Sequence, residues 1–248
     1  MAFCEYHYYS PALGRQTAAN ILLPEVGTAP YPVMYLLHGL SDDYTMWSRR
    51  SNIERHVANV PLIVVMPDGG RGFYSDAVEG ERFLTSLAVE LVDRIDRTFP
   101  TEATRESRCV TGLSMGGYGA LKFALSYPDK FASAVSMSGA VGWGHSELGR
   151  DGEPLSEEWK RLLGPDHIGG PNDLYSLVQT VDADNLPALR IDCGVDDFLI
   201  DDNRKFHAHL DTVNITHEYT EYDGAHTWDY WDEHVQDAIA FHKKSLKF

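Results

Sequence analysis

One serine lies in a residue pattern that is typical of nucleophilic catalysis. Ser114 is flanked by Gly112 and Gly116 in the order G-x-S-x-G, and the apolar pair Cys109-Val110 precedes this pattern. In a nucleophile elbow, a strained turn between a strand and a helix holds the serine hydroxyl clear of the sheet. Free N–H groups at the helix N-terminus favour the negative charge of a tetrahedral oxyanion. We therefore expect Ser114 to be a nucleophile. The alternative is a glycine-rich turn that only packs tightly or binds an anion.

A serine nucleophile needs a base, and the base needs an acid that orients it. In proteins with a nucleophile elbow, the acid and then the histidine follow the serine along the chain, each beyond the carboxyl end of a strand. His226 follows the predicted strand at residues 216–222, and a histidine side chain titrates near neutral pH. Asp196 and Asp197 follow the predicted strand at residues 188–193. We favour Asp197 as the acid. Asp196 is the alternative, because one of two adjacent aspartates can serve only to cap the turn.

Two backbone N–H groups are expected to bind the oxyanion. One belongs to Met115, the residue after the expected nucleophile, and the other to Leu40 in the loop that follows the predicted strand at residues 33–37. The alternative for His38-Gly39 in this loop is a structural turn, and we expect the His38 side chain to be held by a hydrogen bond.

Several aromatic residues are candidates for a substrate pocket, although core packing is the alternative for each of them. Those that we expect in the pocket are Trp47, Tyr74, Trp143 and Trp228, and Trp159 and Trp231 could also line it. We expect no metal site and no cofactor. His207 and His209 are two residues apart on a predicted helix, where such side chains face apart.

The order of the predicted elements indicates an α/β fold with a mostly parallel sheet and helices on both faces. Residues 3–10 and 16–23 are predicted to form an antiparallel edge. We expect one domain over residues 1–248, with an inserted, lid-like segment at residues 138–184, which is rich in glycine and proline; an irregular surface loop is the alternative for this segment. The other expected strands are residues 33–37, 62–66, 107–113, 131–137, 188–193 and 216–222, and the helices are 46–58, 81–98, 115–126, 156–163, 174–181, 203–213 and 227–245.

The composition excludes some classes of partner. The chain has 37 acidic and 21 basic residues and a net charge of −16, so we expect neither nucleic acid nor an anionic membrane as a partner. The first residues lack the basic and apolar regions of a signal peptide, and no apolar run reaches about 18 residues. Three widely spaced cysteines do not form a disulfide framework. We therefore expect a cytoplasmic enzyme with a small-molecule substrate; its oligomeric state is left open, and a homo-oligomer is one alternative.

These motifs resemble those of the α/β-hydrolase esterases of the esterase D and tributyrin esterase type, which are similar to feruloyl and acetylxylan esterases and to S-formylglutathione hydrolases. In that family the acid directly precedes an aromatic residue and a leucine, as Asp197 precedes Phe198-Leu199. The family often has a second glycine in the oxyanion loop, where this chain has Ser41-Asp42-Asp43. The resembling segments are residues 36–40 with Trp47, 73–76, 111–121, 193–199 and 224–231.

The resemblance implies a cofactor-free serine carboxylesterase that hydrolyses short-chain acyl or aryl esters through an acyl-enzyme intermediate. Alternatives are a thioesterase of the S-formylglutathione hydrolase type, a feruloyl or acetyl-sugar esterase, and an enzyme that transfers the acyl group to an acceptor other than water. A catalytically silent binding module with the hydrolase fold is the alternative outside the enzymes.

Overall fold

Antiparallel pairing is confined to one edge of the central sheet. The computed structural model describes residues 1–149 and 152–246, and eight strands of this part lie in the order β1-β2-β4-β3-β5-β6-β7-β8. The pairs β1–β2 and β2–β4 are antiparallel, and all other neighbours are parallel. The predicted mostly parallel sheet with an antiparallel edge is confirmed. The strands are β1 (Ala2–Ser10), β2 (Arg15–Leu23), β3 (Val33–Leu37), β4 (Ile63–Pro67), β5 (Arg108–Leu113), β6 (Ser133–Met137), β7 (Ala188–Gly194) and β8 (His217–Tyr222).

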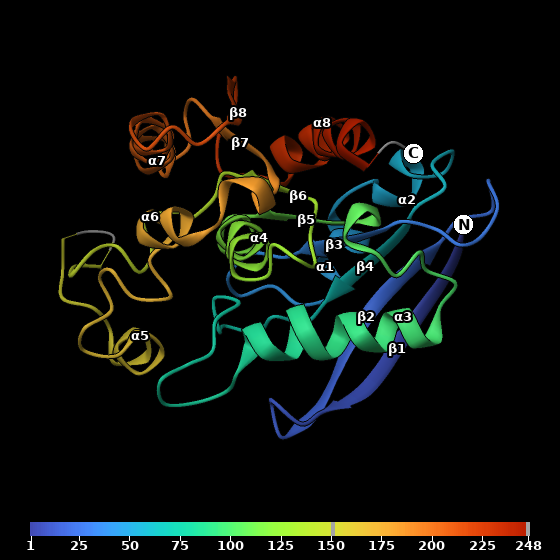
Figure 1. Ribbon diagram of the computed structural model, residues 1–248, viewed down its shortest axis with the longest axis horizontal. Coiled ribbons are helices and arrows are strands. Elements are labelled where there is room, and N and C mark those ends of the chain that lie inside the picture. The colour runs from blue at the N-terminus through green and yellow to red at the C-terminus, as the bar shows by residue number, and fades with distance from the viewer. Residues whose placement is uncertain (150–151, 247–248) are drawn as a thin grey trace.

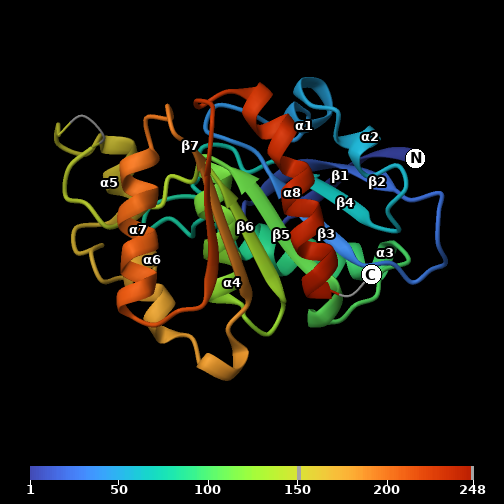
Figure 2. The ribbon, with the colours of Figure 1, turned by 90° about the horizontal axis from the view of Figure 1, so that it is seen from above.

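Helices cover both faces of this sheet, as predicted. The strands β3, β4, β5 and β6 are buried along their whole length, because parallel strands have helices on both sides. One apolar core lies between the sheet and α1, α2 and α8, and a second includes side chains of α3, α4 and α7. Figure 1 shows α8 above the sheet and α3 and α4 below it, and Figure 2 shows α8 lying across the face of the strands. The helices are α1 (Met46–Arg50), α2 (Ile53–His56), the π-helix η1 (Thr85–Leu91), α3 (Val92–Thr98), α4 (Met115–Ser126), α5 (Glu157–Leu163), α6 (Leu174–Leu177), α7 (Ile200–Thr212) and α8 (Trp228–Leu246), with the 3-10 turns η2 (Arg105–Ser107), η3 (Val178–Thr180) and η4 (Ala183–Asn185).

Three predicted helices differ from the structure. The predicted helix at residues 174–181 is the short helix α6 followed by the 3-10 turn η3. The predicted helix at residues 46–58 is two short helices, because Ser51 between them has an extended backbone and the N–H of Asn52 donates to Asp232 on α8. The predicted helix at residues 81–98 begins at Phe83, because Arg82 forms a β-bridge with Asp76, and its part Thr85–Leu91 is the π-helix η1.

Residues 138–184 contain α5, α6 and η3 and lie beside α7 and α4 (Figure 2). Residues 150–151 of this predicted insertion, and residues 247–248 at the end of the predicted domain, lie outside the described residues. The Tyr118 hydroxyl donates to the carbonyl of Asn172 over 2.8 Å, and the Lys122 ammonium donates to the carbonyl of Pro171. These two bonds attach the segment to α4, directly behind the expected nucleophile.

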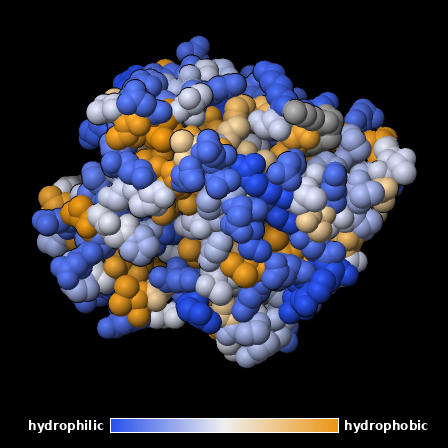
Figure 3. Space-filling view, viewed as in Figure 1, coloured by the Kyte–Doolittle hydropathy of each residue, from blue (hydrophilic) through white to orange (hydrophobic). Residues whose placement is uncertain are grey.

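The face seen in Figure 3 is mainly hydrophilic, with small, separate hydrophobic areas. This distribution agrees with the net charge of −16. Among the described residues, no helix combines the length and the apolar character that crossing a membrane requires.

A buried histidine joins α8 to the sheet. His242 is fully buried, and its two ring nitrogens lie 2.6 Å from the Thr111 hydroxyl on β5 and 2.7 Å from the Ser133 hydroxyl on β6. Burial lowers the pKa of His242 to about 3. The folded protein therefore holds this imidazole neutral over a pH range in which an unfolded chain would protonate it.

His242 is expected to make the fold sensitive to mild acid. Below a pH of about 6.5, which is the pKa of histidine in an unfolded chain, His242 binds a proton only when the chain is unfolded. Proton binding to the unfolded chain therefore lowers the free energy of unfolding by roughly 2 kcal/mol at pH 5 relative to pH 7. We expect the free energy of unfolding of His242→Gln, measured in urea, to fall less steeply between pH 7 and pH 5 than that of the wild type. A His242→Gln slope equal to that of the wild type would contradict this role.

Candidate active site

Ser114 occupies a strained turn between β5 and α4. Its backbone has φ +53° and ψ −117°, a combination that is costly for a residue with a side chain. The two flanking glycines allow this turn. A Cβ atom at Gly112 would lie 2.1 Å from the carbonyl oxygen of Gly116, and one at Gly116 would lie 2.5 Å from the carbonyl oxygen of Leu37. A side chain at either position would collide with backbone, so the G-x-S-x-G pattern is a steric requirement of this elbow.

A chain of hydrogen bonds joins the serine, the histidine and the acid that the sequence predicts. His226 Nε2 lies 3.0 Å from Ser114 Oγ, and His226 Nδ1 lies 2.8 Å from Asp197 Oδ2. A carboxylate can only accept, so the proton of the neutral imidazole is on Nδ1 and the lone pair of Nε2 faces the serine hydroxyl. This is the arrangement in which a histidine can remove the proton of a serine.

The two neighbouring aspartates have different environments. Asp197 is 2% exposed, and its second oxygen accepts the N–H of Leu199 over 2.8 Å. Burial by itself would raise the pKa of Asp197, but the hydrogen bonds from His226 and Leu199 outweigh it and the pKa lies below its usual value. Asp196 is exposed. The geometry therefore brings Asp197, and not Asp196, to the histidine.

Leu40 and Met115 both line the cavity into which Ser114 opens. Met115 is the first residue of α4, where a backbone N–H has no acceptor within the helix. The loop that contains Leu40 lies close to the serine, since a Cβ atom on Gly39 would be 3.7 Å from the Cβ of Ser114.

His38 fixes the shape of this loop. Its buried ring accepts the N–H of Gly69 at Nε2 over 2.8 Å, so the proton lies on Nδ1, which donates to the carbonyl of Gly39 over 2.7 Å. The Tyr74 hydroxyl donates to the carbonyl of His38 over 2.9 Å. The expectation that His38 is held by a hydrogen bond is confirmed.

Ser114 and His226 face a cavity of about 740 Å³. Much of its wall comes from residues between 140 and 149 of the inserted segment, together with Leu155, Trp159, Leu163 and Tyr175. The loop after β7 and the first turns of α7 and α8 supply other parts of the wall. Asp42 and Asp202 also line the cavity, and burial raises the pKa of Asp42. The aromatic side chains in the wall are Phe73, Trp143, Trp159, Tyr175, Phe198, Trp228 and Trp231.

The structure therefore places Trp143 and Trp228 at the cavity, together with Trp159 and Trp231. The prediction that Trp47 and Tyr74 line it is wrong. Trp47 is 1% exposed and its indole N–H donates to the carbonyl of Leu37 over 3.0 Å, so it lies behind Trp228 and not at the surface of the cavity. Tyr74 is fully buried and supports the loop at His38.

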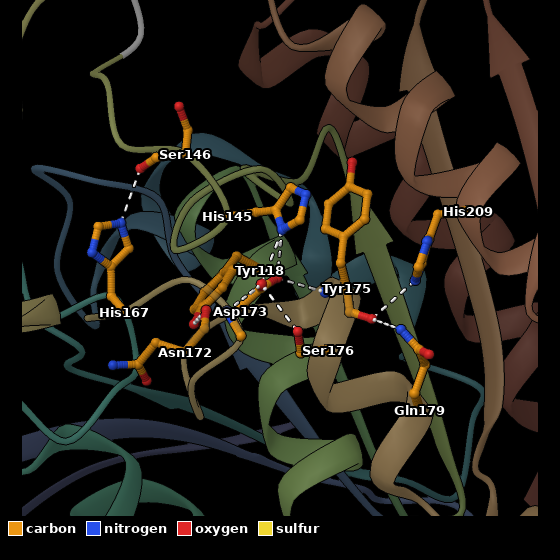
Figure 4. Close-up of polar contacts among 11 residues, drawn as sticks. Tyr118, His145, Ser146, His167, Asn172, Asp173, Tyr175, Ser176, Gln179 and His209 are labelled. Atoms are coloured by element: carbon orange, nitrogen blue, oxygen red, sulfur yellow. Dashed lines mark hydrogen bonds and ion pairs between the residues drawn. The ribbon is translucent and has the colours of Figure 1, made fainter.

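The inserted segment contains a cluster of polar side chains around Asp173 that the sequence does not predict. Asp173 is fully buried and accepts hydrogen bonds from the His145 ring over 2.9 Å, from the Ser176 hydroxyl and from the backbone N–H groups of Gly169 and Tyr175 (Figure 4). Burial alone would raise the pKa of Asp173, but these bonds lower it below its usual value. The His145 ring stacks on Tyr175 at 4.0 Å, and both line the cavity. No sequence spacing could reveal this pair, because Asp173 is 28 positions beyond His145 and α5 lies between them along the chain.

Comparison with known proteins agrees with this geometry. A family model described as "Putative esterase" matches residues 10–242. The chain is 28% identical over 264 aligned residues to an acetyl esterase of Caldicellulosiruptor saccharolyticus, and the alignment covers 98% of this chain and 99% of that protein.

Two solved structures from Staphylococcus aureus are similar over almost their whole length. The fluorophosphonate-binding serine hydrolase FphF, in a substrate-bound form, has a TM-score of 0.85 and 30% identity, with 97% of this chain and 98% of that chain covered. The S-formylglutathione hydrolase FrmB has a TM-score of 0.85 and 31% identity over the same shares of the two chains. The chain therefore belongs to the Esterase family, as a carboxylic ester hydrolase with the α/β-hydrolase fold.

Proposed function

We propose that Ser114, His226 and Asp197 are the catalytic triad of this esterase. The observation that carries the proposal is the continuous hydrogen-bond chain from a buried carboxylate to a serine hydroxyl at the wall of a cavity. His226 Nε2 accepts the proton of Ser114 as Oγ attacks the ester carbonyl carbon. Asp197 keeps the proton on Nδ1 and stabilises the imidazolium that forms.

The N–H groups of Met115 and Leu40 hold the oxygen of the tetrahedral intermediate, and one such donor contributes about 3–4 kcal/mol to catalysis. When the bond to the alcohol breaks, His226 gives its proton to the departing oxygen, which leaves an acyl group on Ser114. Water then attacks this acyl-enzyme while His226 accepts the water's proton. The carboxylic acid leaves, and the serine hydroxyl is restored.

The proposed substrates are esters of short acyl or aryl acids. A cavity of about 740 Å³ is in the range of pockets for drug-sized ligands and has room for an aromatic ring or a bulky alcohol beside a short acyl group. We also propose that the inserted segment belongs to the same single domain as the triad, because Trp143 and Trp159 of its described part supply aromatic side chains to the pocket wall.

Thioester hydrolysis is the second candidate, because FrmB, which is similar over 97% of this chain, is an S-formylglutathione hydrolase. The ratio of kcat/KM for S-formylglutathione to that for p-nitrophenyl acetate distinguishes the two. A ratio above one would favour the thioesterase, and a ratio far below one would favour the carboxylesterase.

Replacement of the nucleophile should abolish turnover and leave the fold intact. We expect Ser114→Ala to lower kcat for p-nitrophenyl acetate by at least about 10⁴-fold and to lose labelling by a fluorophosphonate. Ser146, a second serine of the cavity wall, gives the matched control. Ser146→Ala should keep the wild-type kcat and the labelling by the fluorophosphonate. Activity of folded Ser114→Ala close to that of the wild type would refute the assignment.

The adjacent aspartates give a sharper test of the triad. Asp197→Asn removes the charge that stabilises the imidazolium and should lower kcat by about 10³- to 10⁴-fold. Asp196→Asn alters an exposed side chain and should change kcat by less than about threefold. Measurement of both variants with one ester decides the acid, and the reverse order of effects would move it to Asp196.

Trp159 is expected to select for aromatic esters. Its ring lines the cavity and lies edge-on to Phe73 at 5.7 Å. Because loss of an aromatic contact costs about 0.5–1.5 kcal/mol, Trp159→Ala should lower kcat/KM for p-nitrophenyl benzoate about three- to tenfold. It should change kcat/KM for p-nitrophenyl acetate much less. An equal loss with both esters would show that Trp159 does not contact the acyl ring.

A further inference from the structure

A group of metal-ligating side chains lies outside the active site, where α7 ends and β8 begins. His207 and Asp211 are one turn apart on α7, and His217 is the first residue of β8. One donor atom from each of them lies within 4.8 Å of the other two. His207 Nδ1 is 2.7 Å from His217 Nε2, and His207 Nε2 is 3.7 Å from Asp211 Oδ2.

The surroundings orient the two imidazoles as in protein metal sites. His217 Nδ1 donates to the backbone carbonyl of Ile215 over 2.8 Å, which leaves a lone pair on Nε2, the atom that faces His207. Metal-binding histidines commonly donate their other ring N–H to a carbonyl in this way. The ring of His207 stacks on Tyr219 at 4.2 Å and 7°, so its orientation is also restricted.

We propose that His207, Asp211 and His217 bind a Zn²⁺ ion. Two imidazoles and one carboxylate are a common ligand set for zinc, whereas Mg²⁺ and Ca²⁺ prefer oxygen ligands alone. A water molecule completes a tetrahedral shell. The net charge of −16 favours uptake of a divalent cation. The two cations of α7, Arg204 and Lys205, are paired with Glu221 and Asp202.

Only small movements are needed to form the site. Zinc–nitrogen bonds of 2.0–2.1 Å at tetrahedral angles put two nitrogens about 3.3 Å apart, so the two histidine nitrogens must separate by about 0.6 Å. The proton that His207 Nδ1 now donates to His217 moves to His207 Nε2, so the ring stays neutral and Nδ1 presents its lone pair to the ion. Asp211, which is 63% exposed, is free of packing that would prevent it from closing on the ion.

The position of the site implies a structural role. The ion would join the end of α7 to the start of β8 and close the loop at residues 213–216. Asp197 lies before α7 and His226 lies after β8, so the ion would stabilise the unit that carries both. It does not touch the reacting atoms, and the proposal is independent of the proposed function.

Zinc binding to the chelator-treated full chain tests the proposal. In calorimetric titration with ZnCl₂, we expect the wild type to bind one equivalent that His207→Gln and His217→Gln lack or bind more than tenfold more weakly. Asp211→Asn should weaken binding to a smaller extent. Zinc at about 100 times its dissociation constant should raise the Tm of the wild type by about 5–10 °C, and MgCl₂ should not.

His209 supplies the matched control on the same helix. It bonds to the carbonyl of Tyr175 over 2.9 Å, away from the proposed ligands, so His209→Gln should keep the wild-type affinity for zinc. Esterase activity without zinc reports that each variant is folded, and it also separates this proposal from the assignment of the triad. The absence of zinc binding by the wild type, or equal affinity in the wild type and both histidine variants, would overturn the site.

Discussion

The close approach of three backbone segments at Ser114 is the constraint on which the rest of the site depends. β5 turns into α4 so tightly that Gly112 meets the carbonyl of Gly116, and Gly116 meets the carbonyl of Leu37 at the end of β3. The nucleophile is thereby fixed against the strand that leads into the oxyanion loop. Trp47 donates to that same Leu37 carbonyl, so a buried aromatic side chain supports the position of the serine without facing the substrate.

In several histidines of this chain, the hydrogen bond at one ring nitrogen determines whether the other nitrogen can accept a proton or a hydrogen bond. Asp197 holds Nδ1 of His226, and the free Nε2 meets a serine hydroxyl. In His38 both nitrogens bind backbone groups, so this ring supports a loop and has no chemistry of its own. His145 is held by Asp173 much as His226 is held by Asp197, but it stands in the cavity wall. The same side chain therefore takes different roles according to its partners.

The local chemistry of the site could be predicted from sequence because it lies at the ends of strands. Ser114, Asp197 and His226 each follow a buried or edge strand, and parallel strands bring such residues to one edge of the sheet. What could not be predicted depends on packing between distant segments. The sequence does not tell whether an aromatic side chain near the site faces the cavity or supports its wall from behind. Trp47 and Tyr74 do the latter, since they donate to the backbone carbonyls of Leu37 and His38. The partner of His207 could not be predicted either, because His217 reaches it from another element.

Acidic residues in the cavity wall have a consequence for the release of product. An ester enters as a neutral molecule, whereas the acid that hydrolysis produces ionises in water to a carboxylate. Asp42 and Asp202 line the same cavity as Ser114, and Lys205 in its wall pairs with Asp202 over 3.6 Å. The whole molecule carries a net charge of −16. Like charges repel more strongly where water is partly excluded. The excess of negative charge therefore weakens the binding of the ionised acid relative to that of the neutral ester, so the product leaves the cavity more readily than the substrate.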